Sequence, residues 1–187
     1  MEAVIISGEP AAGKTTAAGM VGKMLGIRAV SVGDVLKEMA ADRGYKVTGE
    51  GWWDTPDGMK FLAEREKTSD FDKRADEIMI RKVKAGNIVV TSYTLPWISK
   101  YGIKIWLHGS PEKRAERMAG RDDISVRECV RIVKQRDDEN YKLYRNLYGI
   151  EFGKDLKPFD LTIDTDNIPA EEVATIIMDF VKKKTGK

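Results

Sequence analysis

Short apolar runs alternate along this chain with longer stretches whose apolar residues recur at helical spacing. Strands are predicted where apolar residues dominate a short run, at residues 3–7, 28–32, 88–90, 103–107 and 159–164. Helices are predicted at residues 15–25, 33–42, 70–84 and about 170–181, and two more follow Pro111 with a break at residues 120–123. This alternation predicts an α/β three-layer domain with a mainly parallel central sheet.

Two segments do not fit the alternation. Residues 43–68 hold several glycines and a proline beside Trp52 and Trp53, which indicates a compact insertion. The two indoles either stack on a base or a lid, or pack the insertion against the main body, and we favour packing. The three lysines at 182–184 are expected in a solvated tail.

The first strand leads directly into a phosphate-binding loop pattern, Gly-x-x-x-x-Gly-Lys-Thr. Glycines at both ends let backbone N–H groups curl around an anion, and the N-terminus of the following helix adds about half a positive charge. A chance match in a glycine-rich turn is the alternative, but the strand before the pattern and the helix after it argue against that. The predicted nucleotide-binding residues are Gly8, Glu9, Pro10, Ala11, Ala12, Gly13, Lys14, Thr15 and Thr16.

Within this loop, Lys14 is expected to reach the outer phosphates of a nucleoside triphosphate such as ATP. The Thr15 hydroxyl is expected to help hold Mg²⁺, and Thr16 to support the inner phosphates. GTPases, transport ATPases and small-molecule kinases all share such a loop, so the loop alone defines no reaction.

Composition restricts the protein class further. The 187 residues suit a single domain, and a net charge of +2 argues against broad electrostatic binding to nucleic acid. Cys129 lies in a helical pattern and is expected to be a small core residue. With no signal peptide or membrane-spanning run in this sequence, we expect a cytoplasmic protein that works without membrane or nucleic acid, as a monomer.

Arginines gather after Pro111. Arg114, Arg117 and Arg121 are spaced by three and four residues, so they share one helix face, and Arg136 lies on the next helix. Either these arginines form a solvated face paired with nearby acids, or they belong to a lid, at about residues 111–146, that brings guanidinium groups onto transferring phosphates.

Polar residues 91–94 follow the third strand, where ligands bind in open α/β sheets, so they are site candidates. The lone His108 at another strand end is given no catalytic role. No Asn-Lys-x-Asp guanine signature is present, and the chain is short for a transport ATPase. One insertion, at about residues 34–84, and one arginine-rich lid suit a nucleoside monophosphate kinase, which holds two nucleotides end to end and excludes water.

Nearly the whole chain resembles the short archaeal-type cytidylate kinases. Apart from the phosphate loop, the resemblance is carried by residues 31–37, 72–76, 104–107, 114–117, 144–150 and 159–165. It implies transfer of the γ-phosphoryl group of ATP to CMP or dCMP with Mg²⁺. It also implies that Arg117, Arg121 and Arg136 stabilise the moving phosphoryl group and that residues 165–169 flank the donor base. The implied acceptor residues are Ser31, Asp34, Lys37 and Asp72, with Asp34 alternatively only a helix cap. Tyr93 is a further acceptor candidate because of its place after the third strand.

Departures from this family fall in the acceptor half. Residues 91–93 read Thr-Ser-Tyr where the family has Glu-Gly-Arg, Tyr141 stands where a second arginine is expected, and Lys37 replaces another. Arg43, Arg74 and Arg145 are candidates to compensate, while Tyr93 and Trp97 either shape an altered pocket or pack against the insertion. Two rival functions follow: a kinase for a different small acceptor, or a nucleotide-dependent binding factor that is not a kinase.

Overall fold

The structure of the chain is a computed structural model that describes residues 1–49, 52, 55–65, 70–122 and 124–186, with the side chains of Arg121 and Asp122 outside this description. Trp53 also lies outside the described residues. All statements on the fold and the site below concern the described part of the chain.

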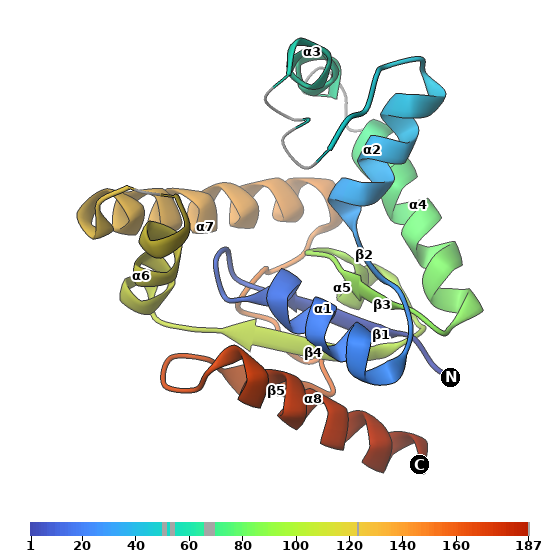
Figure 1. Cartoon of the computed structure of the whole chain (residues 1–187), viewed down its shortest axis with the longest axis vertical. Coiled ribbons are helices and arrows are strands. Elements are labelled where there is room, and N and C mark those ends of the chain that lie inside the picture. Colours follow the sequence, from blue (N-terminus) through green and yellow to red (C-terminus); the bar gives the residue numbers. More distant parts are fainter. Residues whose placement is uncertain (50–51, 53–54, 66–69, 123, 187) are drawn as a thin grey trace.

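Five parallel strands form the central sheet, in the order β2-β3-β1-β4-β5 (Figure 1). Val4 in the middle strand lies between Val89 and Ile103, so apolar residues line up across the sheet. The strands are β1 (Val4–Gly8), β2 (Ala29–Ser31), β3 (Val89–Thr91), β4 (Ile103–His108) and β5 (Leu161–Asp164). The predicted α/β fold class is confirmed, and all pairings among the described strands are parallel.

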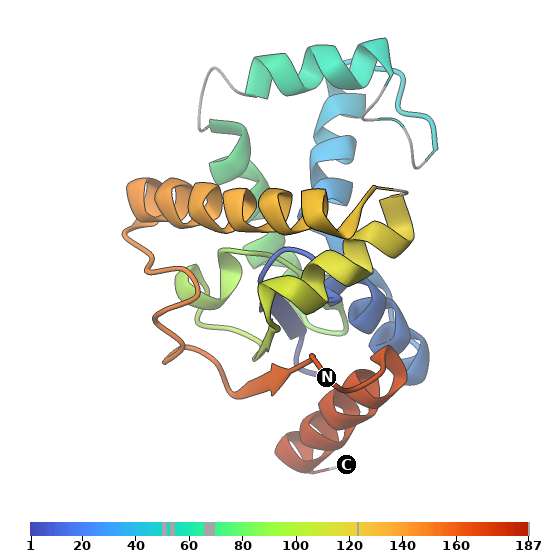
Figure 2. The same ribbon diagram turned by 90° about the vertical axis from the view of Figure 1, so that its left-hand side faces the viewer.

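Helices cover both faces of this sheet, as Figures 1 and 2 show. They are α1 (Lys14–Leu25), α2 (Val32–Asp42), α3 (Pro56–Arg65), α4 (Asp70–Ala85), α5 (Leu95–Ile98), α6 (Pro111–Asp122), α7 (Val126–Tyr148) and α8 (Ala170–Thr185). Helices α1 and α8 share one hydrophobic core with β1 and β4, around Ile6 and Ile105. Helices α2, α4 and α5 share a second core on the opposite face, around Ile5 and Val90.

Two helices were not predicted. Helix α3 lies inside the insertion, where glycines and Pro56 masked its ten helical residues, and α5 is only four residues long. The lysines at 182–184 are exposed, as predicted, but they belong to α8 rather than to a tail, because the helix continues to a Gly186 cap.

Helix α2 starts differently from the prediction. Its N-cap is Ser31, whose hydroxyl accepts a hydrogen bond from the Asp34 amide at 3.1 Å. Asp34 occupies the third helical position, and its Oδ2 accepts from the Ser31 amide at 2.7 Å. Asp34 therefore completes a reciprocal capping box and is not itself the N-cap.

The insertion packs against the main body through aromatic side chains. Trp52 is fully buried, with its ring 5.8 Å from that of Phe61, and Phe61 contacts Phe71 at 5.2 Å. These contacts agree with a packing role for Trp52. In both views α3 lies at the end of the molecule away from the C-terminus, and α7 lies between α3 and the sheet (Figures 1 and 2).

Candidate active site

The phosphate loop begins with a glycine that nothing else can replace without strain. Gly8 has φ 148°, and a Cβ placed there would lie 2.0 Å from the backbone oxygen of Leu107 in β4. Ala11 has φ 60°, a left-handed conformation that is costly for a residue with a side chain. The loop is therefore held in one shape by its contact with the neighbouring strand.

Lys14 starts helix α1 and crosses this loop. Its Nζ donates to the backbone oxygen of Glu9 at 2.6 Å and lies 4.6 Å from the centre of the Tyr93 ring. Burial, together with the nearby guanidinium groups of Arg136 and Arg114, lowers the pKa of Lys14 to about 7. Within the described residues this ammonium donates its hydrogen bond to a backbone oxygen and not to a carboxylate, so an arriving phosphate would add a strong electrostatic interaction.

A cavity of about 480 Å³ opens above the loop, and we refer to it as the donor cavity because residues predicted to bind ATP line it. Its floor is residues 11–16 of the loop and α1, and its far end is formed by Thr165, Ile168 and Val173. Arg117 lines it from α6, but its guanidinium donates to the Thr165 hydroxyl at 3.0 Å and to the Thr165 backbone oxygen. Arg117 therefore holds the loop after β5 in this structure.

Arg114 is buried, which contradicts the alternative interpretation of the arginines as a solvated face. It also does not line either of the two cavities described here. It is 1% exposed, and its guanidinium makes a bidentate pair with Asp137 of α7 at 2.9 and 2.7 Å. The same group donates to the backbone oxygens of Gly109 and Pro10 and pairs with Glu9 at 3.3 Å. Arg114 thus joins the phosphate loop to the helix that carries Arg136.

A second cavity, of about 570 Å³, lies between the insertion and α7. Ser31, Asp72 and Tyr93 line it, as predicted for the acceptor site, together with Arg65 of α3. Asp34 and Lys37 are not on its described wall: Asp34 serves the capping box, and Lys37 Nζ donates to the Gly49 oxygen at 3.2 Å. We refer to this space as the acceptor cavity.

Asp76 lies at the base of the acceptor cavity and is 6% exposed. Its carboxylate accepts hydrogen bonds from Thr94 and Tyr148, both at 2.8 Å. Burial raises the pKa of Asp76, while these two hydrogen bonds act in the opposite direction. Asp76 therefore ties α4 to the end of α7 and to the polar residues after β3.

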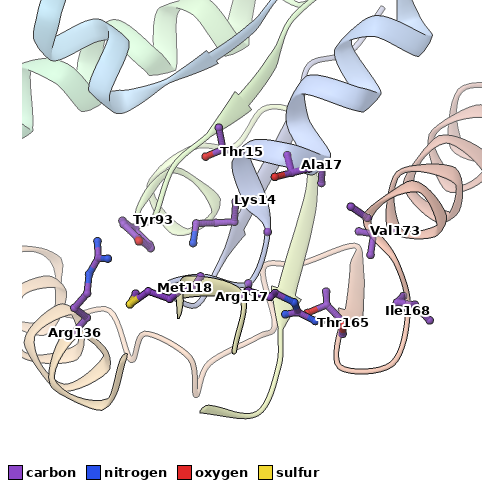
Figure 3. A pocket seen from close by; sticks show the side chains of 15 residues that line it. Lys14, Thr15, Ala17, Tyr93, Arg117, Met118, Arg136, Thr165, Ile168 and Val173 are labelled. Atoms are coloured by element: carbon purple, nitrogen blue, oxygen red, sulfur yellow. Dashed lines mark hydrogen bonds between the residues drawn. The ribbon is translucent and has the colours of Figure 1, made fainter. Parts of the chain in front are cut away.

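The two cavities meet at four residues. Lys14, Thr15, Tyr93 and Arg136 line both of them. Figure 3 shows Lys14 and Arg136 approaching this junction from α1 and α7, with the Tyr93 side chain near them. A group that passes from one cavity to the other must pass these side chains.

Several predicted residues lie elsewhere. Gly8, Glu9 and Pro10 of the loop line neither of these two cavities, and the Glu9 carboxylate accepts from the Gly109 amide at 3.1 Å. The side chain of Arg121 is outside the described residues. Tyr141 donates to Glu151 away from both cavities, and the three candidate compensating arginines, Arg43, Arg74 and Arg145, are also absent from the described cavity walls.

Sequence reasoning missed Arg65 and Asp76, and it grouped Arg114 with the other lid arginines instead of predicting its burial. Arg65 reaches the acceptor cavity only because α3 folds back over α2 and α4, and no local pattern indicates that. Arg114 shares its helical face with Arg117, so spacing alone does not separate a buried connector from a cavity residue.

No cluster of three or more His, Cys, Asp or Glu side chains suited to a metal occurs in the part of the chain that the structure describes. Thr15, at the start of α1, is exposed and lines the donor cavity, so its hydroxyl is the group that could hold Mg²⁺. None of the described helices is long and apolar enough to cross a membrane.

A phosphate loop between β1 and α1, a parallel sheet and two adjoining cavities define a P-loop kinase fold. Solved structures agree: a shikimate kinase from Acinetobacter baumannii aligns over 100% of this chain and 96% of its own, with a TM-score of 0.59 and 14% identity. A gluconokinase from Sinorhizobium meliloti covers 97% of this chain and 92% of its own, also with a TM-score of 0.59 and 14% identity. At this identity the likeness shows the fold alone.

Sequence comparison identifies the family. Residues 3–167 match the cytidylate kinase-like family, and the chain belongs to it. The cytidylate kinase of Pyrobaculum aerophilum is 34% identical over 96% of this chain and 92% of its own length. The cytidylate kinase of Pyrococcus horikoshii is 31% identical over 93% of this chain and 85% of its own.

Proposed function

We propose that this protein transfers the γ-phosphoryl group of ATP to a nucleoside monophosphate, CMP or dCMP, and releases ADP with CDP or dCDP. The observation that carries the proposal is the junction of the two cavities at Lys14, Thr15, Tyr93 and Arg136. The cytidylate kinases to which the chain is similar give the acceptor class.

The donor would lie with its phosphates over residues 11–16 and its base toward Ile168 and Val173. The unpaired backbone N–H groups at the N-terminus of α1, which lines the cavity, would favour phosphate oxygens. Bound Mg²⁺ would neutralise phosphate charge, and the Thr15 hydroxyl is the residue placed to hold it. Arg117 would act on the donor side, through the loop after β5 that it already holds.

Transfer needs position and charge more than proton chemistry. The acceptor phosphate oxygen attacks the γ-phosphorus, the bond to the β–γ bridging oxygen breaks, and ADP leaves with that oxygen. Lys14 and Arg136 flank the junction and would offset the charge on the transferring group, so no protein general base is required. Arg121 stays a prediction in the same role.

We further propose that residues 1–187 act as one kinase domain, with residues 34–84 closing over the acceptor and residues 111–146 over the donor. Helices α2, α3 and α4 contribute side chains to the acceptor cavity. Helices α6 and α7 contribute Arg117 and Arg136 to the donor cavity. Two closing segments on either side of the junction would exclude water from the transfer.

The test is ADP formation from ATP and Mg²⁺ with CMP, dCMP, UMP, AMP, GMP and shikimate as acceptors, with Lys14→Ala as the inactive control. We expect CMP or dCMP to exceed every other acceptor in kcat/KM by at least about tenfold, the discrimination of about 1.4 kcal/mol that one well-placed contact gives. Preferential turnover of another acceptor would reassign the substrate. ATP hydrolysis that no acceptor stimulates would refute the kinase proposal.

A further inference from the structure

The proposed transfer gives Tyr93 no role beyond lining the junction of the two cavities. This residue lies two positions after the end of β3, at the edge of the sheet where ligands bind in α/β folds. Its ring contacts Lys14, the one basic residue of the phosphate loop: the Lys14 Nζ lies 4.6 Å from the ring centre. At this distance the electron-rich face of the ring attracts the ammonium, so Tyr93 can act on Lys14 as well as on the shape of the cavities.

The Tyr93 ring is itself held by a cluster of aromatic side chains. Its centre lies 5.8 Å from that of Tyr144 on α7 and 5.6 Å from that of Phe152, with the Phe152 ring edge-on at 75°. Phe152 contacts Trp106 of β4 at 5.3 Å, and Trp106 is buried. The backbone oxygen of Tyr93 also accepts from the Ser7 hydroxyl at 3.4 Å. The ring is thus anchored to the sheet, whereas the lysine that it contacts has a flexible four-carbon stem.

A neutral ring suits the charge balance at the junction. In the view of Figure 3 the Tyr93 side chain lies between those of Lys14 and Arg136, and the Arg136 guanidinium is one of the groups that lower the pKa of Lys14. A third cation at this position would repel the ammonium further. Burial raises the pKa of Tyr93, so its phenol stays neutral near pH 7. The ring therefore attracts the ammonium and adds no charge of its own.

The contact with Tyr93 leaves Lys14 able to bind phosphate. An ammonium has three N–H donors, of which one is used by the backbone oxygen of Glu9 at 2.6 Å. The ring face takes a second direction, so at least one donor is left for a phosphate oxygen. Because the ring and a phosphate do not compete for one donor, the contact can persist when nucleotide binds. A lysine that is held before binding also loses less conformational entropy on binding.

Resting on the proposed function, we propose that Tyr93 is a positioning residue for Lys14. Its ring, fixed by the aromatic cluster, keeps the ammonium at the junction, where it meets the phosphates of the donor. Tyr93 acts through Lys14, so the face of the ring matters and the hydroxyl does not. The effect of removing the ring on nucleotide affinity should therefore disappear when Lys14 itself is absent.

The test is a double-mutant cycle read by calorimetric titration with ADP and Mg²⁺ at neutral pH. Tyr93→Leu removes the ring but keeps an apolar side chain, and Tyr93→Phe keeps the ring but removes the hydroxyl. Both are made with Lys14 present and in Lys14→Met protein. The matched control is Phe159→Leu, because Phe159 contacts Trp106 in the same cluster at 5.1 Å and is not on the described walls of either cavity. Thermal unfolding of each variant checks that it is folded.

We expect Tyr93→Leu to weaken ADP binding about threefold to tenfold, the effect of losing one cation–π contact. Tyr93→Phe and Phe159→Leu should each stay within about twofold of the unchanged protein, because both keep a ring face beside the ammonium. In Lys14→Met protein, Tyr93→Leu should leave the ADP affinity unchanged. A role in packing alone would instead lower the melting temperature in Tyr93→Leu and Phe159→Leu alike, without this dependence on Lys14.

Three results would overturn the inference: an equal loss from Tyr93→Leu with and without Lys14, a loss in Tyr93→Phe as large as that in Tyr93→Leu, or tighter ADP binding by Tyr93→Leu. The titrations use no acceptor, so they are separate from the test of the proposed function. A dependence on Lys14 in a protein that phosphorylates no acceptor would support the positioning role and refute the kinase proposal. Turnover of CMP in a protein with an additive cycle would do the reverse.

Discussion

The donor and acceptor cavities are built in different ways. Most of the donor floor comes from one continuous stretch, residues 11–16, whereas the acceptor wall gathers side chains from α2, α3, α4, α7 and the residues after β3. The first can be encoded in a local motif because its groups are backbone amides and adjacent side chains. The second depends on how distant helices pack, so it can change its chemistry while the donor loop stays the same.

The largest expected effect is the loss of stability when the contact between the phosphate loop and the lid, made by Arg114, is removed. Arg114→Met would leave Asp137 and Glu9 without their buried counter-charge, together with the backbone oxygens of Gly109 and Pro10. We expect the free energy of unfolding in urea to fall by about 3–5 kcal/mol. Arg131→Met removes an exposed pair with Glu128 on α7 and should change stability by less than about 0.5 kcal/mol. A loss below about 1 kcal/mol for Arg114→Met would show that the two regions are joined by other contacts.

The donor half alone is tested by Lys14→Ala. Removing an ammonium that acts at the junction should lower kcat/KM by about a hundredfold to a thousandfold, the cost of losing one charge-stabilising group. Lys23→Ala, at an exposed position of the same helix, serves as the control and should retain full activity. Activity that survives Lys14→Ala would mean that transfer takes place away from this loop.

A smaller effect should appear in the pH dependence of donor binding. Because burial lowers the pKa of Lys14 to about 7, the free protein loses this charge above neutrality, whereas bound phosphates favour the protonated form. Nucleotide binding should therefore take up a proton, and affinity should fall by up to about tenfold per pH unit above pH 7.

Isothermal titration with ADP in buffers of different ionisation enthalpy, from about pH 7.5 upward where phosphates have lost their last proton, measures this uptake. Lys14→Met should bind ADP more weakly and without that pH dependence. Equal proton uptake in the variant would assign the dependence to another group.

The smallest effect concerns loop strain. Ala11 pays the cost of a left-handed conformation at φ 60°, and glycine adopts it freely. Ala11→Gly is expected to stabilise the protein by up to about 1 kcal/mol, after the larger chain entropy of unfolded glycine is subtracted. Thermal unfolding of the two proteins decides: a lower melting temperature for the variant would mean that the Ala11 methyl group contributes packing that outweighs the strain.

The contrast between a locally encoded donor loop and an acceptor wall built from distant helices also explains which features could be predicted from the sequence. The strands, the long helices, the loop and its flanks follow short-range patterns, and the structure confirms them. Ser31 and Asp72, predicted through family resemblance, and Tyr93, predicted from its place after the third strand, do line the acceptor cavity. Asp34 was assigned to the wrong cap position because Ser31 and Asp34 are both good capping residues three positions apart.

The remaining differences are tertiary. Helix α3 and Arg65 depend on aromatic packing around Trp52 and Phe61, which joins segments distant in sequence. The burial of Arg114 depends on Asp137, 23 residues away on another helix. Neither the helical spacing of residues nor the net charge indicates which distant segments pack together. The position of Arg65 in the cavity wall and the burial of Arg114 could therefore be seen only in the folded chain.

The contacts of Arg114 also define a boundary for protein engineering. They connect residues 9–10, Gly109 and Asp137, and in the described part of the chain the hydrogen bonds and ion pairs of Arg114 do not extend to α2, α3 or α4. A recombined enzyme can therefore keep this connector and its partners from one parent and take residues 34–84 from another. The insertion is the natural cassette for changing what receives the phosphoryl group while the means of supplying it is left intact.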